Sequence, residues 1–307
     1  KVGAANARAV ASCDKERLGF LLDPYACNYD PLRDAGALCV GVSGEGVTGT
    51  NADAATCMAR NEAVALNKIW YGPTTDGSYD ANAGYDVRSG KVLAPRQLWW
   101  GFPRGSNIAG IITNARADML AITLQDVRYA ADASAANDNP LVNTSTPVRN
   151  RWQELTYASY AAAFAEAQSR PDLVEYATDK DLARFRGLGR KMIVWSGLAE
   201  DAIPPQGSVH YYERVKAAAG GEAEMQKLVR MYNVPGVAHS SQGRAYTVGG
   251  NNNSVPIPML PGNANQVPAR DQDPLFSARV DWVERGQPPG QMVIRSRDNG
   301  TSHPICV

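Results

Sequence analysis

The chain has 307 residues, of which 44% are hydrophobic and 20% charged, a balance typical of a folded globular protein. Its 31 basic and 31 acidic residues cancel, so it lacks the excess positive charge with which proteins bind nucleic acid. No apolar run approaches the roughly 20 residues that cross a bilayer. We therefore expect neither a nucleic-acid partner nor a membrane partner.

The first part of the chain combines short helices with turn-rich segments. Residues 4–12 are rich in alanine and predict a helix, and residues 54–70 show helical periodicity. The intervening segment 41–53 is rich in Gly and Thr, which indicates turns. Residues 151–168 predict a further helix that ends before Pro171.

From residue 179 onward, helical and extended patterns alternate. The compact apolar run KMIVWSG predicts a buried strand, and KLVRMYNVPG predicts the next strand. The flanking segments carry helix start and stop signals. The strands are expected at 191–197 and 227–236, and the helices at 179–189, 204–221 and 273–289. This alternation predicts an α/β fold whose parallel sheet packs between helices. We therefore place a domain boundary near residue 178, between an irregular domain (1–178) and an α/β domain (179–307).

The cysteine pattern favours disulfides over metal binding. Four cysteines lie close together, but 13, 11 and 17 residues separate them and the first histidine is His210. Zinc sites have closer CxxC-type pairs with histidines nearby, so we expect two disulfides and a secreted or periplasmic protein. A fifth cysteine would then be unpaired, which suggests a partner outside this chain. The cysteines are Cys13, Cys27, Cys39, Cys57 and Cys306.

Reactive side chains follow both predicted strands. Glu200 and Asp201 come after the first strand, and His239 comes after the second. The carboxyl ends of parallel strands meet at one edge of a sheet, where open α/β folds bind their ligands. A carboxylate that orients an imidazole produces a general base, so the three residues are candidate catalytic groups. Two structural interpretations stay open: a hydrogen-bonded structural histidine, and acids that favour the start of the next helix.

A nucleophile to match this base is not evident in the chain. A nucleophile elbow reads GxSxG between a strand and a helix. The nearest string, GVSGEG at 41–46, has misplaced glycines and no such context, so Ser43 is a poor candidate. We expect the nucleophilic serine to lie upstream of Lys1.

Three strings of the α/β part stand out: GLAEDAIPPQGSVHYYERV (197–215), VPGVAHSSQG (234–243) and VDWVERGQPP (280–289). Three more lie in the first part of the chain: CD (13–14), DPYAC (23–27) and NKIWYGP (67–73). Together these strings resemble the tannase and feruloyl esterase family, a group of α/β-hydrolases with a large inserted lid. The resemblance implies that 1–178 is a lid and 179–307 the C-terminal part of an α/β-hydrolase domain. It also implies a serine esterase that forms an acyl-enzyme with small aromatic esters, such as gallates or hydroxycinnamates.

The resemblance also assigns roles within the site. It makes His239 the general base and Glu200 the acid by position, with Asp201 as the alternative after a small loop shift. The N-terminal half of the same protein would supply the serine. Family members usually have a cysteine after the histidine, bridged to a cysteine before the serine. Because Ser240 stands there, that bridge cannot form from this side.

For the lid, the resemblance implies the pairs Cys13–Cys27 and Cys39–Cys57. The family lid often carries a calcium loop, but the corresponding segment 13–24 keeps only Asp14 and Asp23. Since calcium takes 6–8 oxygen ligands, a bound calcium is doubtful, and the proposed chemistry requires no cofactor.

Four aromatic side chains could line a phenolic pocket or simply pack within the lid, as tryptophans usually do. They are Trp99, Trp100, Phe102 and Trp152. Two other functions remain as alternatives. One is a non-catalytic family relative that binds aromatic esters or glycans. The other is an unrelated cysteine-stapled binding module, against which the alternation over 179–289 argues.

Overall fold

The computed structural model describes residues 1–80, 93–108, 155–169, 182–239, 245–248, 254–255, 274–296 and 300–306. The helices are α1 (Val2–Cys13), α2 (Arg60–Tyr71), α5 (Tyr157–Ser169), α7 (Ala183–Gly187), α8 (Gln206–Ala219), α9 (Glu222–Met225) and α10 (Pro274–Arg285), with a 3-10 turn η1 (Pro31–Arg33). The strands are β1 (Met192–Gly197), β2 (Val229–Val234), β3 (Ala245–Val248), β4 (Ser254–Val255), β5 (Met292–Ser296) and β6 (Ser302–Ile305). Among the described helices, none is long and apolar enough to cross a membrane.

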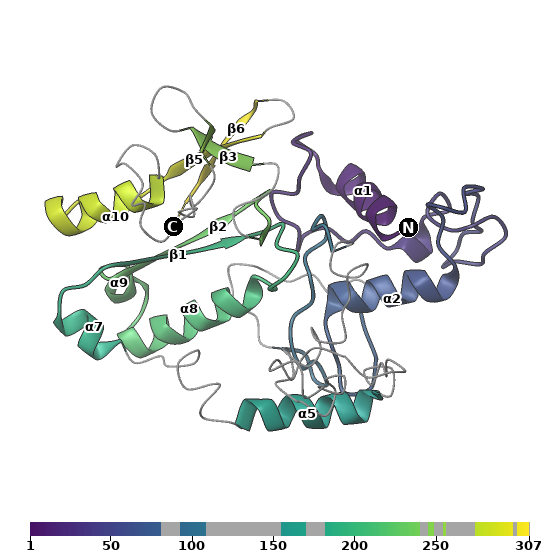
Figure 1. Ribbon diagram of the computed structural model, residues 1–307, viewed down its shortest axis with the longest axis horizontal. Helices are drawn as coiled ribbons and strands as arrows, with labels where there is room; N and C mark the ends of the chain where they lie inside the picture. The colour runs from purple at the N-terminus through teal and green to yellow at the C-terminus, as the bar shows by residue number, and fades with distance from the viewer. Residues whose placement is uncertain are drawn as a thin grey trace, which may run out of the picture.

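Strands β1 and β2 form the predicted parallel pair, in a register that sets Met192 opposite Val229 and Gly197 opposite Val234. Helix α8 connects them and packs on one face, while α10 lies on the other side of the pair (Figure 1). Successive residues of a strand point to opposite faces of the sheet. Because this sheet is covered on both sides, side chains on both faces must be apolar. Accordingly Val194 packs in the cluster with α8, and Trp195 packs in the cluster on the α10 side.

The C-terminal strands form a second sheet that the sequence analysis did not predict. Its order is β4-β3-β5-β6, and all its described pairs are antiparallel. Pro304 lies in β6 at the edge of this sheet, which is where a residue without an N–H is tolerated. Ile294 and Ile305 bury their side chains in the same cluster as Tyr232 of β2, so the second sheet covers one face of the first.

The N-terminal part has a core of its own. Helices α1 and α2 enclose it, and two disulfides join Cys13 to Cys27 and Cys39 to Cys57, the pairs that the resemblance implies. Helix α2 begins at Arg60, later than the predicted residue 54. The preceding residues form a separate turn, which the hydrogen bond from Cys57 N–H to Asp53 O closes at 2.8 Å. The disulfide of Cys57 and the bridge between Met58 and Leu38 then separate this turn from α2.

Residues from both sides of the predicted boundary near 178 share two further cores. Leu18 and Phe20 pack with Tyr232 and other residues of the sheets, and Trp100 packs with the residues of α8. The hydroxyl of Ser296 also donates a hydrogen bond to the carbonyl of Leu18, at 2.7 Å. The N-terminal part is therefore anchored on the α/β part, and a division near 178 stays a prediction.

Candidate functional site

The two strand-end loops are held together by main-chain hydrogen bonds. After β1, the N–H of Leu198 donates to Val234 O and the N–H of Ala199 donates to Val237 O, both at 2.9 Å. Gly197 makes this approach possible, because a Cβ atom there would lie only 2.3 Å from Val237 O. The loops that carry the candidate acids and the candidate base are thus fixed against each other.

Glu200 and His239 meet at this edge of the sheet. Glu200 Oε1 lies 2.9 Å from His239 Nδ1 and also accepts the main-chain N–H groups of Ala202 (2.7 Å) and Ile203 (3.1 Å). Glu200 is buried, with 8% of its surface exposed, whereas 49% of the His239 side chain is exposed. The buried acid is thus fixed by its own loop, and it orients an imidazole that remains accessible.

This contact sets the chemistry that the imidazole can perform. An ionised carboxylate only accepts hydrogen bonds, so a ring paired with it donates from Nδ1 and keeps a lone pair on Nε2. Within the described residues, His239 Nε2 has no hydrogen-bond partner. The arrangement can therefore accept a proton at Nε2 and stabilise the resulting imidazolium through the carboxylate.

Asp201 contacts the same histidine at a different point. Its Oδ1 accepts the main-chain N–H of His239 at 3.2 Å, while the imidazole ring is bonded to Glu200. From sequence position, either acid was a candidate to hydrogen-bond the His239 imidazole. In this geometry one acid holds the ring and the other holds the backbone.

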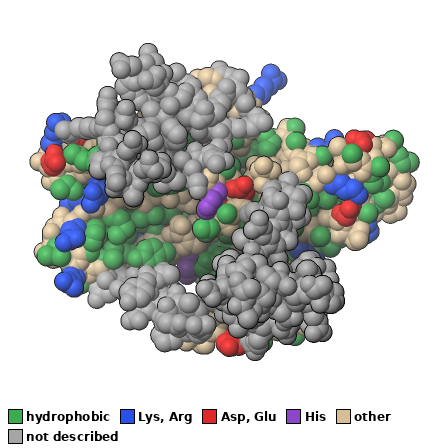
Figure 2. Space-filling model, viewed as in Figure 1, with side chains coloured by type: hydrophobic (Ala, Val, Ile, Leu, Met, Phe, Trp, Pro, Cys, Tyr) green, Lys and Arg blue, Asp and Glu red, His purple; other side chains and the backbone are tan. Residues whose placement is uncertain are grey.

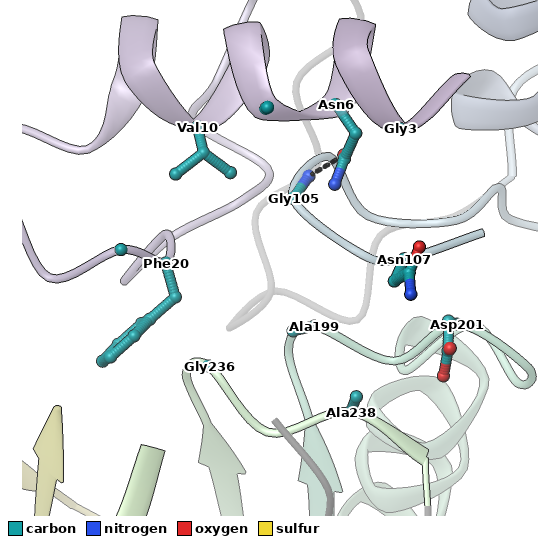
Figure 3. Close-up of a pocket in the computed structure, with 12 residues that line it drawn as sticks. Gly3, Asn6, Val10, Phe20, Gly105, Asn107, Ala199, Asp201, Gly236 and Ala238 are labelled. Carbon is teal, nitrogen blue, oxygen red and sulfur yellow. Dashed lines mark hydrogen bonds between the residues drawn. The ribbon is translucent and has the colours of Figure 1, made fainter. Parts of the chain in front are cut away.

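A cavity of about 490 Å³ adjoins this pair. It lies between α1 and the loops after β1 and β2, with Val10 and Phe20 at one end and Asn6, Asn107 and Asp201 at the other (Figure 3). Its described lining residues are Gly3, Asn6, Ala7, Val10, Gly19, Phe20, Gly105, Asn107, Ala199, Asp201, Gly236 and Ala238. In the space-filling view, a histidine and a neighbouring acidic side chain reach the surface near the middle of the face, beside hydrophobic side chains (Figure 2).

Part of α1 lines this cavity, although no sequence pattern pointed to it. Gly3 and Ala7 lie four residues apart on one face of the helix, with Asn6 and Val10 beside them. Small residues on a helix face permit close approach, but an alanine-rich helix has many such positions. Only the packing of α1 over the strand ends identifies which of them face the site.

The candidate aromatic side chains have other neighbours. Trp100 is 2% exposed and contacts Trp99 edge to face, with 4.8 Å between the ring centroids, while Phe102 packs against the lid core. None of the three is among the described residues that line the cavity. Trp152 and Ser240 lie outside the described residues.

The remaining candidates are accounted for locally. Ser43 pairs with Thr48 in an antiparallel bridge of the N-terminal part, and its carbonyl accepts a hydrogen bond from Arg60. The Asp14 carboxylate accepts the N–H groups of residues 18 and 19, and Asp23 Oδ1 accepts those of residues 25 and 26. No group of three or more metal-ligating side chains occurs within the described residues. Cys306 is an exposed free thiol.

The family model for tannase and feruloyl esterase matches residues 1–306. The chain belongs to the tannase and feruloyl esterase family. A probable feruloyl esterase from Arthroderma benhamiae is 29% identical over 149 residues, which cover 48% of this chain and 24% of the relative. An uncharacterised esterase from Xanthomonas campestris is 25% identical over 313 residues, which cover 97% of this chain and 48% of that protein.

The crystal structure of an esterase from Aspergillus oryzae superposes with a TM-score of 0.60 at 20% identity, over 99% of this chain and 51% of that one. This likeness concerns the fold alone and is consistent with a fold of the α/β-hydrolase type. The chain spans about half the length of the Xanthomonas esterase and of the Aspergillus oryzae esterase.

Proposed function

We propose that this chain is the lid and the C-terminal part of a serine carboxylic-ester hydrolase that acts on aromatic, phenolic esters. The contact between Glu200 and His239, at a cavity beside the strand ends, carries the proposal. Family membership supports ester hydrolysis, and feruloyl esterases among the relatives support an aromatic acyl group. Two disulfides support a secreted or periplasmic location, since such bonds persist in oxidising compartments.

The nucleophilic serine comes from sequence upstream of this chain. Within the described residues, no serine hydroxyl hydrogen-bonds to His239, and the full-length relatives are about twice as long. That upstream segment would also supply main-chain N–H groups for the oxyanion, as nucleophile elbows do. In this arrangement residues 1–178 form a lid over the site.

The mechanism proceeds through an acyl-enzyme. His239 Nε2 takes the serine proton as the hydroxyl oxygen attacks the ester carbonyl, and the imidazolium then returns the proton to the leaving alcohol. Water repeats the sequence in the second half: His239 removes its proton, the acyl–serine bond breaks, and the serine oxygen is reprotonated. Glu200 keeps the imidazole in the tautomer that leaves Nε2 free and stabilises the imidazolium in both halves.

The test uses the full-length protein with p-nitrophenyl, gallate and ferulate esters. Removing an imidazole base or its carboxylate partner costs several orders of magnitude, so His239→Ala should lower kcat about 10³-fold or more and Glu200→Gln about 10²–10⁴-fold. His303→Ala is the matched control, because His303 lies in β6 and does not line the cavity. Wild-type turnover in His239→Ala would refute the assignment. A folded wild-type protein that binds these esters without cleaving them would identify a non-catalytic relative.

A further inference from the structure

We infer that Asp201 makes the cavity prefer uncharged, hydrogen-donating aromatic esters over esters that carry a carboxylate. The inference rests on the proposed function and concerns the charge of the group that enters the site. The Asp201 side chain lines the cavity, and its Oδ1 accepts a hydrogen bond from the main-chain N–H of His239. Within the described residues, Asp201 Oδ2 has no hydrogen-bond partner.

Within the part of the chain that the structure describes, no positively charged side chain lines the cavity to balance this carboxylate. Among its described lining residues, Asp201 is ionisable and no lysine, arginine or histidine occurs. Two arginines adjoin lining residues in sequence, but both are engaged elsewhere. Arg8 forms a two-pronged ion pair with Asp34, at 2.6 and 2.7 Å, and Arg104 donates to Tyr29 O at 2.9 Å with its guanidinium over Trp70.

Two further carboxylates lie near Asp201 and add to the negative charge at the cavity. Glu200 lies next to Asp201 in the chain, with its carboxylate on the His239 ring. Asp14 accepts the N–H of the lining residue Gly19 at 2.7 Å, which places a further carboxylate behind the cavity wall. A carboxylate on the substrate would therefore enter a site of like charge, and the imidazolium formed in turnover is already paired with Glu200.

The other polar groups suit an uncharged substituent. Asn6 Oδ1 accepts the N–H of Gly105 at 2.8 Å, so the Asn6 amide NH₂ is the end that remains to donate. Asn6, Asn107 and Asp201 lie at one end of the cavity, and Val10 and Phe20 lie at the other (Figure 3). An aromatic ring can pack against Val10 and Phe20 while a hydroxyl at its far side donates to Asp201 and accepts from the amides.

The experiment compares two esters with the same skeleton: methyl 4-(hydroxymethyl)benzoate, which is uncharged, and monomethyl terephthalate, which carries a carboxylate. A like charge several ångströms away in a partly hydrated site should lower kcat/KM for the anionic ester about tenfold relative to the neutral one. Asp201→Asn removes the charge but keeps an oxygen that can accept the His239 N–H, so this ratio should fall to about twofold. High salt should narrow the wild-type ratio, because screening weakens the repulsion.

The matched control is Glu284→Gln, which removes one negative charge from the exposed end of α10 and should leave the ratio unchanged. A second arm does not depend on catalysis: binding of 4-(hydroxymethyl)benzamide and 4-carboxybenzamide to the full-length protein, measured by calorimetry. If neither ester is cleaved, the proposed function is wrong. The calorimetric comparison of the two amides then still tests whether Asp201 disfavours a carboxylate. Equal affinity for the two amides, binding of neither, or a ratio unchanged in Asp201→Asn would overturn the inference.

Discussion

Gly197 offers the sharpest test of how the fold positions the catalytic pair. It ends β1, three residues before Glu200, and its Cα faces the loop that carries His239. A Cβ atom at Gly197 would lie 2.3 Å from Val237 O and 2.9 Å from Val237 C. These are main-chain atoms, so no side-chain rotation can relieve the contact.

The size of the effect follows from that distance. Ordinary contacts at a Cβ begin near 3.4 Å, so in Gly197→Ala the loop must retreat by about 1.1 Å. A misplacement of about 1 Å in a catalytic geometry costs roughly 10²-fold in rate. The same movement stretches the hydrogen bond from Ala199 N–H to Val237 O, and overpacking of this kind typically destabilises a protein by about 1–3 kcal/mol.

The assay measures kcat/KM of the full-length protein on a p-nitrophenyl ester, together with thermal unfolding. Gly197→Ala should lose about 100-fold in kcat/KM, well beyond any loss explained by its unfolded fraction. Gly187→Ala is the control, since nothing lies within 4 Å of a Cβ at that position in α7. Wild-type kcat/KM in Gly197→Ala would show that the close approach of the two loops does not position the pair.

Two further predictions concern the stability of the N-terminal part. Hydrogen bonds from Arg8, and a further one from Tyr29, lower the pKa of Asp34 below its ordinary value of 3.8. The ionised Asp34 therefore stabilises the folded protein above pH 3.8, and this stabilisation is lost as the pH falls through the lowered pKa. Asp34→Asn should therefore lower the unfolding free energy by about 2 kcal/mol near neutral pH, and a denaturant series in which this difference does not shrink in acid would contradict the reasoning. Removing the Cys39–Cys57 disulfide by a double Ser substitution should cost about 3 kcal/mol for its 18-residue separation, and an unchanged denaturation midpoint would argue against a constraint on the unfolded chain.

The parallel pair and its reactive edge could be predicted because their signals are local. Strand β1 is a mainly apolar run that ends at Gly197, and β2 is an apolar run interrupted by Arg230 and Asn233 that ends just before Pro235. Buried parallel strands are rich in apolar residues of this kind. Parallel strands place their carboxyl ends at one edge. Residues that follow the two runs must then lie near each other, as the Glu200–His239 contact does.

The C-terminal sheet escaped prediction for a different reason. Asn299–Gly300 is a strong hairpin signal, and the strands β5 and β6 lie on either side of it. These strands are short, and Pro304 argues against a strand unless the strand lies at an edge. The position of β6 in the sheet depends on partners distant in sequence, so the local pattern could not establish it.

The sequence could not assign separate roles to Glu200 and Asp201, because the conformation of their loop decides them. Glu200 and Asp201 differ by one methylene and one position, and either can reach a nearby imidazole. The main-chain N–H groups of residues 202 and 203 point back at Glu200 Oε1 and fix the longer side chain under the ring. Asp201 instead accepts the main-chain N–H of His239 and lines the cavity. In this loop conformation Glu200 orients the imidazole base, and Asp201 supplies the charge that the substrate contacts. For this reason Glu200→Gln should impair turnover of both esters, whereas Asp201→Asn should change the preference between them.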